Sequence, residues 1–213
     1  MPEKEVIFSK VEDAVKVLAE YARRFRFPCF DKDPAEIARE SAESPWLKSM
    51  ARKRSGCAEF YQRWADANVP KMAKSVRYVI NQSQFDILVR RTGEDLLRSW
   101  REAFAERPSK LSYGAAYRAV DLLFLAIDES ERCRHDSVRR FLHAPLDGTT
   151  LKPLRLIVDE LTEVEFALEI PATVPSGFVA TEEQYVLLQG AISVLARRAG
   201  IPPILYAYWC TEG

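Results

Sequence analysis

One aspartate in this chain, Asp147, has the surroundings of a carboxylate that could take part in chemistry. It lies in the proline-containing stretch 143–151, after a basic segment and before a new apolar one. An aspartate at a helix start lies near the positive end of the helix dipole, which favours its ionised form. Such a carboxylate could stabilise positive charge that develops on a bound substrate. In the simpler interpretation, Asp147 only caps the helix that follows it.

A glycine-containing turn precedes this aspartate, between two segments of helical pattern. Glycine allows a tight turn and a close approach of the backbone, and the N–H groups of the following helix start could bind a phosphate without sequence preference. The residues that would make this contact are Lys110, Ser112, Tyr113, Gly114 and Ala115. A single glycine between helices is also the ordinary sign of a turn.

The elements that must position these residues are predicted to be helices. Helices are predicted over 11–25, 33–44, 57–67, 85–104, 115–128, 131–142, 149–161 and 181–199, from apolar residues at helical spacing and from end signals such as the capping-box pattern of Thr181 and Gln184 and the closing Gly200. Prolines are expected to end helices near Phe27 and Ser44, and a further helix is expected after Pro70. A short strand is expected within 164–170. The fold class predicted from this pattern is mostly α.

The length and composition fit a globular helical protein. A chain of 213 residues can form one large domain or two small helical lobes around a shared groove. The four cysteines are scattered and the histidines number two, so we expect reduced thiols, no metal site and no cofactor. No apolar run approaches the length of a membrane span, and the first residues lack the pattern of a signal peptide. We therefore expect a cytoplasmic protein that does not bind membranes.

The charge is unevenly distributed along the chain. Lys and Arg together number 31, as do Asp and Glu, but the segment from Leu156 to the end has two basic and eight acidic residues. Residues 1–155 therefore have 29 basic and 23 acidic residues. A basic surplus in this part of the chain is compatible with nucleic-acid binding, and it also occurs in proteins that bind none.

Taken in order, these features resemble the helix-hairpin-helix DNA glycosylase superfamily, and within it the archaeal 8-oxoguanine DNA glycosylases. The resemblance covers residues 56–213 and depends on order and spacing: an apolar helix, the polar turn 81–84, a long basic helix, the turn before Gly114, an apolar helix, then Ala144-Pro145-Leu146-Asp147. It ends in a helix, prolines and a terminal aromatic cluster. Residues 1–55 form an N-terminal extension outside it. The implied fold is a single unit, 1–213, of two helical lobes with a central cleft for DNA and a flipped base.

The resemblance also implies an activity. Asp147 inherits the role of the catalytic carboxylate, which stabilises an oxocarbenium-like sugar and orients a water while a damaged or modified base leaves. Members that also cut the strand carry a lysine after the hairpin glycine; here Ala115–Arg118 occupies that region, and an arginine does not lose its proton. We therefore expect a monofunctional glycosylase, which removes the base without cutting the strand, unless Lys110 or Lys152 supplies the amine.

The base pocket is expected to contain aromatic rings, because a flipped base gains about 1–3 kcal/mol by stacking on one. The candidates are Tyr61, Trp64, Tyr208 and Trp209, with Gln82 as a reader of the base edge. Aromatic residues at helical spacing also form cores, and Gln82 could simply cap a helix. The chain lacks the acidic residue that the archaeal enzymes place shortly before their terminal tryptophan, so 8-oxoguanine is a doubtful substrate; oxidised, alkylated or hypermodified phage bases are alternatives.

The predicted partner is double-stranded DNA with a modified base, bound by a monomer. Two alternatives need no catalysis: a helical DNA-binding module on the same scaffold, and a helical module that binds another protein. The first would bind DNA with a strong salt dependence and leave every base attached.

Overall fold

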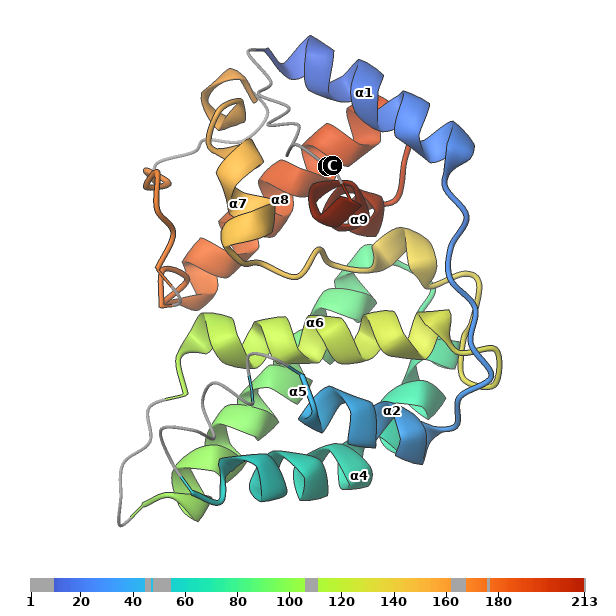
Figure 1. Cartoon of the computed structure of the whole chain (residues 1–213), viewed down its shortest axis with the longest axis vertical. Helices are drawn as coiled ribbons and strands as arrows, with labels where there is room; N and C mark the ends of the chain where they lie inside the picture. Colours follow the sequence, from blue (N-terminus) through green and yellow to red (C-terminus); the bar gives the residue numbers. More distant parts are fainter. Residues whose placement is uncertain are drawn as a thin grey trace. The chain divides into compact units, whose positions relative to one another are not determined.

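Helices make up most of the chain in the computed structural model, which describes residues 10–44, 47, 55–105, 111–161, 168–175 and 177–212. No β-sheet occurs among these residues, and Phe30 and Ser130 form an isolated parallel bridge. The predicted mostly α fold is therefore confirmed. The α-helices are α1 (Val11–Arg24), α2 (Pro34–Ala42), α4 (Cys57–Ser75), α5 (Gln82–Ala103), α6 (Tyr113–Glu129), α7 (Gly148–Leu154), α8 (Glu182–Ala199) and α9 (Pro203–Glu212) (Figure 1).

The helices are divided between two compact units, each built from separate stretches of sequence. Unit 1 consists of Met1–Arg26, Ser112–Arg118 and Arg140–Gly213, and unit 2 of Phe27–Leu111 and Ala119–Arg139. Helix α6 supplies its first turns to unit 1 and its remainder to unit 2.

In unit 1, helices α1, α7 and α8 all pack against α9, and α1 also packs against α8. Their almost fully buried apolar side chains include Leu18, Leu151, Leu188, Ile192, Leu195, Ile204 and Tyr206. Thr181 caps α8 through the amide of Gln184 at 3.3 Å, and Gly200 ends it with a left-handed φ of 68°. The Thr181 cap and the closing glycine are thus present, while the Gln184 side chain accepts from the Ala180 amide at 2.7 Å and not from that of Thr181.

In unit 2, α4 packs against α2 and α5. The core is rich in aromatic rings: Phe85 meets Phe124 of α6 edge-to-face at 5.2 Å between centroids, and Phe60 meets Trp100 at 5.3 Å. Asp33 begins α2 with a full capping box, in which its carboxylate accepts from the Glu36 amide at 2.9 Å and its own amide donates to Glu36 at 2.8 Å. This helix was expected at this position.

Three predicted helices differ from the structure in extent or in type. Helix α4 continues through Pro70 to Ser75, because Pro70 lies on the exposed face, where water can bond the carbonyl that loses its partner. The helix expected over 131–142 is a series of turns ending in the 3₁₀ helix Arg139–Phe141. The helix expected over 149–161 ends at Leu154, after which i→i+3 bonds lead to the 3₁₀ helix Val158–Glu160.

Two other segments also depart from expectation. The strand expected within 164–170 lies mostly outside the described residues, and 168–170 has no regular structure. The aromatic end of the chain, which carried no helix prediction, is the helix α9, with Pro203 at its first position. Proline is favoured there because the first helical N–H has no intrahelical partner.

Candidate functional site

Asp147 occupies the N-cap position of α7, as the sequence predicts. Its Oδ1 accepts from the amides of Thr149 at 2.8 Å and Thr150 at 3.2 Å, while the hydroxyl of Thr150 accepts from the Asp147 amide at 3.0 Å. One carboxylate oxygen is therefore occupied by helix capping. The surroundings of the other oxygen determine whether Asp147 can also contact a substrate.

That second oxygen faces a guanidinium. Nη2 of Arg118, on α6, lies 2.6 Å from Asp147 Oδ2, and the two side chains retain 30% and 27% of their exposure. Both residues belong to unit 1. Arg118 also has a buried Nε with no hydrogen-bond partner among the described residues. Both carboxylate oxygens therefore have donors, and the side chain is held in place while it stays partly open to solvent.

Helix α9 borders this pair from another side. The Tyr206 hydroxyl donates to the carbonyl of Thr150 at 2.6 Å, which ties α9 to the first turn of α7. Burial, opposed by a hydrogen bond with Tyr206 and assisted by the charge of Asp147, raises the pKa of the nearby Cys210 thiol to about 12. Cys210 therefore stays protonated at neutral pH, and the thiolate needed for nucleophilic chemistry is scarce.

The sequence missed Arg118 and Cys210 as neighbours of the aspartate. Arg118 lies four residues after Gly114, hence on the same face of α6, and this spacing is the one signal that could have indicated it. No comparable signal pointed to Cys210, because α9 was not expected to be helical.

The turn before α6 is occupied by internal hydrogen bonds. The Gly114 amide donates to the carbonyl of Val179 at 2.8 Å, and the Ala115 amide to the hydroxyl of Ser112 at 3.3 Å. The Tyr113 ring stacks on Tyr117 at 4.0 Å between centroids. Lys110 lies outside the described residues. The amides of Gly114 and Ala115 therefore have acceptors within the protein, which leaves neither for a phosphate in this arrangement.

Gly114 instead permits close packing. A Cβ at this position would lie 2.8 Å from both the Cβ and the carbonyl oxygen of Val179. We expect Gly114→Ala to lower the free energy of unfolding by about 1–3 kcal/mol, the usual cost of overpacking a core. Urea denaturation measures this cost.

Gly190, inside α8, is the matched control, because a Cβ there has no atom within 4 Å. Gly190→Ala should raise the free energy of unfolding by about 0.5–1 kcal/mol, since glycine weakens a helix interior. Equal effects of the two substitutions would contradict the packing role of Gly114.

The expected base-pocket residues are distributed over both units. Tyr61, Trp64 and Gln82 belong to unit 2, whereas Tyr208 and Trp209 belong to α9 of unit 1. The Tyr61, Trp64 and Trp209 side chains have 1%, 6% and 7% of their surface exposed, so each ring is part of a core and offers no face to a base in this arrangement.

The remaining contacts of these residues are internal as well. Trp64 Nε1 donates to Asp95 at 2.9 Å, and the Gln82 amide donates to Asp86 one turn further along α5 at 2.8 Å. Tyr208 is half-buried and packs on Phe25, with 4.7 Å between ring centroids. Among the four candidate rings, only that of Tyr208 retains appreciable exposure, and its role in a base pocket stays a prediction.

His143, which the sequence placed close to Asp147, has a structural partner. Its Nδ1 lies 2.8 Å from the Tyr185 hydroxyl in a buried position of unit 1, and Gln189 bonds both backbone groups of the next residue, Ala144. These contacts connect α8 to the segment before α7. They give the histidine a place in the core.

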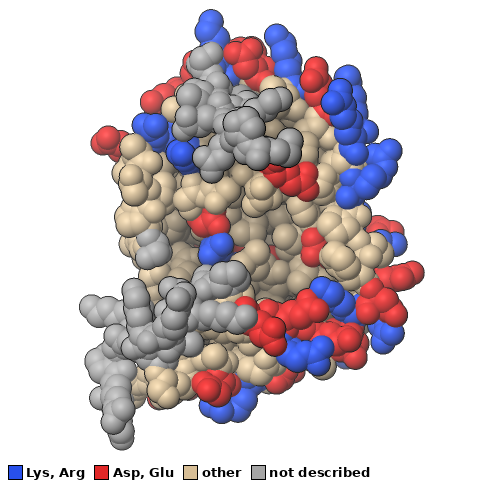
Figure 2. Space-filling view, in the orientation of Figure 1, with Lys and Arg blue, Asp and Glu red and all other residues tan. Residues whose placement is uncertain are grey.

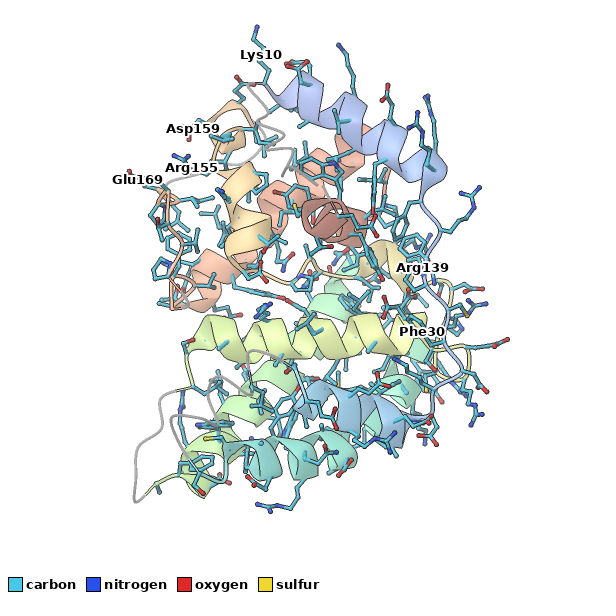
Figure 3. The ribbon with its side chains drawn as sticks, viewed as in Figure 1. Lys10, Phe30, Arg139, Arg155, Asp159 and Glu169 are labelled. Atoms are coloured by element: carbon cyan, nitrogen blue, oxygen red, sulfur yellow. The ribbon has the colours of Figure 1, made fainter. Side chains whose placement is uncertain are left out.

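A second charged pair lies buried in unit 2. Arg139 Nε donates to Asp128 at 2.7 Å, the Asp128 side chain is 3% exposed, and the guanidinium also covers the Phe27 ring at 4.2 Å (Arg139 is labelled in Figure 3). Burial raises the pKa of Asp128, against the hydrogen bond and charge of Arg139, which lower it. The pair lies where α6 ends, and breaking it is expected to lower the free energy of unfolding strongly.

On the face drawn in Figure 2, the acidic and basic side chains of the described residues are mixed. Figure 2 shows Lys and Arg side chains gathered along α1, whose last turn includes Arg23 and Arg24, while Asp and Glu mix with them over α2. Basic residues at the end of α1 complement the negative pole of that helix. On the drawn face, charge alone does not mark a nucleic-acid interface.

Two features are absent from the described residues. No group of three or more His, Cys, Asp or Glu side chains there could hold a metal ion. None of the helices in that part of the chain combines the length and the apolar content that a membrane crossing requires. Comparisons with protein-family models, with curated proteins and with solved structures each give no match to this chain.

Proposed function

We propose that this protein is a DNA glycosylase that hydrolyses the N-glycosidic bond of a modified base, with Asp147 as its catalytic carboxylate. The observation that carries the proposal is the partly exposed Asp147 carboxylate, fixed by two α7 amides and by Arg118. The turn at 112–114 belongs to the same unit. The order of elements that resembles helix-hairpin-helix glycosylases supplies the reaction class.

In this reaction the bond between C1′ and the base nitrogen breaks, and the base leaves with the electron pair. The sugar becomes oxocarbenium-like, and the Asp147 carboxylate stabilises its positive charge. Water adds to C1′, one of its protons goes by way of solvent to the departing base, and an abasic site remains. Because the basic side chain paired with Asp147 is a guanidinium, which keeps its proton, we expect no Schiff base from it and an intact strand.

In the protein without DNA, the positive charge of Arg118 offsets the negative charge of Asp147. An approaching sugar cation would be opposed by the guanidinium unless Arg118 turned away from Asp147. The phosphates of bound DNA offer an alternative acceptor, and the buried Arg118 Nε still lacks one among the described residues. In this mechanism, Arg118 moves to a phosphate when DNA binds, and Asp147 Oδ2 becomes available to the sugar and to the attacking water.

The proposal is tested with genomic DNAs that differ in base modification. Each is incubated with the protein, released bases are identified by mass spectrometry, and abasic sites are counted by alkaline cleavage. We expect one class of modified base to be released, with one alkali-labile site for each base. Release of no base from any of these DNAs would refute the enzymatic proposal.

A non-catalytic helical DNA-binding module is the second candidate. The observation that favours it is the closed state of the turn, in which the Gly114 and Ala115 amides are bonded within the protein and Asp147 is paired. Such a module would retard DNA with a strong salt dependence and release no base. The same incubation, combined with a binding titration, distinguishes it from the enzyme.

A further inference from the structure

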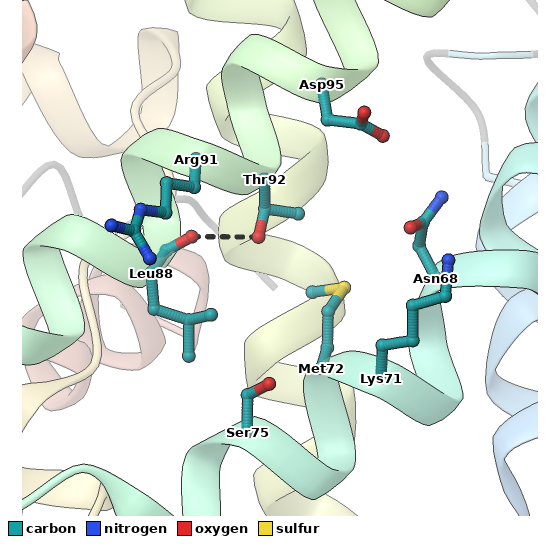
Figure 4. Close-up of a pocket in the computed structure, with 8 residues that line it drawn as sticks. All are labelled: Asn68, Lys71, Met72, Ser75, Leu88, Arg91, Thr92 and Asp95. Carbon is teal, nitrogen blue, oxygen red and sulfur yellow. Dashed lines mark hydrogen bonds between the residues drawn. The ribbon is translucent and has the colours of Figure 1, made fainter.

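Unit 2 contains a groove between α4 and α5, separate from the residues around Asp147 (Figure 4). Its volume is about 150 Å³. Its apolar members include Met72 and Leu88, and polar side chains surround them. The lining residues are Asn68, Lys71, Met72 and Ser75 from α4, with Leu88, Arg91, Thr92 and Asp95 from α5.

The negative charge at this groove is already neutralised. Asp95 Oδ2 accepts from Trp64 Nε1 at 2.9 Å, and its other oxygen forms an ion pair with Arg98. Both carboxylate oxygens are therefore engaged by groups that do not line the groove. Asp95 thus offers little unpaired charge to a cation.

The two cations of the groove are not neutralised. Neither Lys71 nor Arg91 has an ion pair or hydrogen bond with any other described residue, and both side chains are exposed. They stand on facing helices, and Ser75 adds a hydroxyl on the α4 side. Thr92 donates its own proton to the Leu88 carbonyl at 2.8 Å, so it adds no donor. The lining therefore offers two positive charges and a hydroxyl, which are groups that bind anions.

We propose that this groove binds a phosphate of a DNA backbone. The identity of the polymer rests on the proposed function. A volume of 150 Å³ lies below the roughly 300 Å³ or more of pockets that enclose a drug-sized ligand, which favours one group of a longer chain over a whole small molecule. Lysine and arginine both bind phosphate, as a point charge and as a planar donor respectively.

Fluorescence anisotropy of a labelled DNA duplex, measured over a range of salt concentrations, tests the groove. We expect the double variant Lys71→Gln/Arg91→Gln to lower the magnitude of the slope of log K against log [salt] by about 0.9, because the contact with one phosphate is lost. At ~0.1 M salt the same relation gives an affinity loss of about eightfold for the double variant.

The control is Lys74→Gln/Arg101→Gln, which removes the same charge from exposed positions of the same two helices outside the groove. It should retain most of the wild-type affinity and slope. The proposal would be overturned if the two double variants lost the same amount of DNA affinity, or if the groove variant bound DNA as tightly as the wild type. It would also be overturned if the wild-type protein did not bind DNA.

The base-release assay separates this proposal from the enzymatic one. If wild-type protein binds DNA through the groove and releases no base, the groove proposal stands and the glycosylase proposal is refuted. If wild-type protein releases a base, and the groove variant binds DNA and releases the base as well as wild type does, the glycosylase proposal stands and the groove proposal is refuted.

Discussion

Asp147→Asn is expected to reduce the rate of base release by at least about a hundredfold. Removal of one preorganised group that stabilises transition-state charge typically costs about 10²–10³ in rate, and asparagine has the shape of aspartate without its charge. Single-turnover release of the base, measured with enzyme in excess over DNA, reports the chemical step directly. DNA affinity should remain close to that of the wild type.

The fold should tolerate this substitution, which makes the rate measurement interpretable. Asparagine caps helices about as well as aspartate, so the bonds to the Thr149 and Thr150 amides can persist. The ion pair with Arg118 is partly exposed, and such pairs contribute about 1 kcal/mol or less. Asp147→Ala, which also removes the cap, should cost about 1 kcal/mol of stability.

Asp33→Asn is the matched control, because Asp33 caps α2 in unit 2 by the same kind of bond. It should leave base release unchanged. If Asp147→Asn and Asp33→Asn both retained full activity, Asp147 would be a helix cap with no catalytic role.

The sequence predicted those helices whose apolar spacing and end signals agree. Helix α2 begins at a capping aspartate followed by proline, and α8 ends at a glycine with positive φ, so local chemistry defines them. The length of α4 was missed because the tolerance of Pro70 depends on its exposure in the folded chain. Exposure is a tertiary property that the local pattern does not contain.

The candidate site was predicted only in part for the same reason. The capping role of Asp147 follows from the turn and the residues next to it. Its partner Arg118 comes from another helix, and the contact between the Gly114 amide and Val179 joins residues far apart in sequence. Aromatic candidates such as Trp64 were ambiguous because helical spacing is the same for a core residue and for a pocket residue; burial distinguishes them.

The largest effect on stability is expected at the buried pair in unit 2. Arg139→Leu leaves the Asp128 carboxylate almost fully buried without its cation, and breaking a buried pair in this way costs about 3–5 kcal/mol. Urea denaturation near pH 7 measures the destabilisation. Arg132→Leu is the control, because Arg132 pairs with Asp31 at the exposed surface of the same unit; its stability should stay close to that of the wild type.

The pH dependence of this destabilisation identifies its cause. Because the pKa of Asp128 is raised in the folded chain, its contribution favours the folded state at acid pH and declines as the pH rises through the folded pKa. Arg139→Leu removes the hydrogen bond and the charge that lower this pKa, so it raises the pKa further. The destabilisation relative to the wild type should therefore be smallest near the unfolded pKa of about 3.9 and grow toward neutral pH. A destabilisation that did not change between about pH 5 and pH 7.5 would attribute the effect to the missing packing of Arg139 on Phe27 rather than to a buried, uncompensated charge.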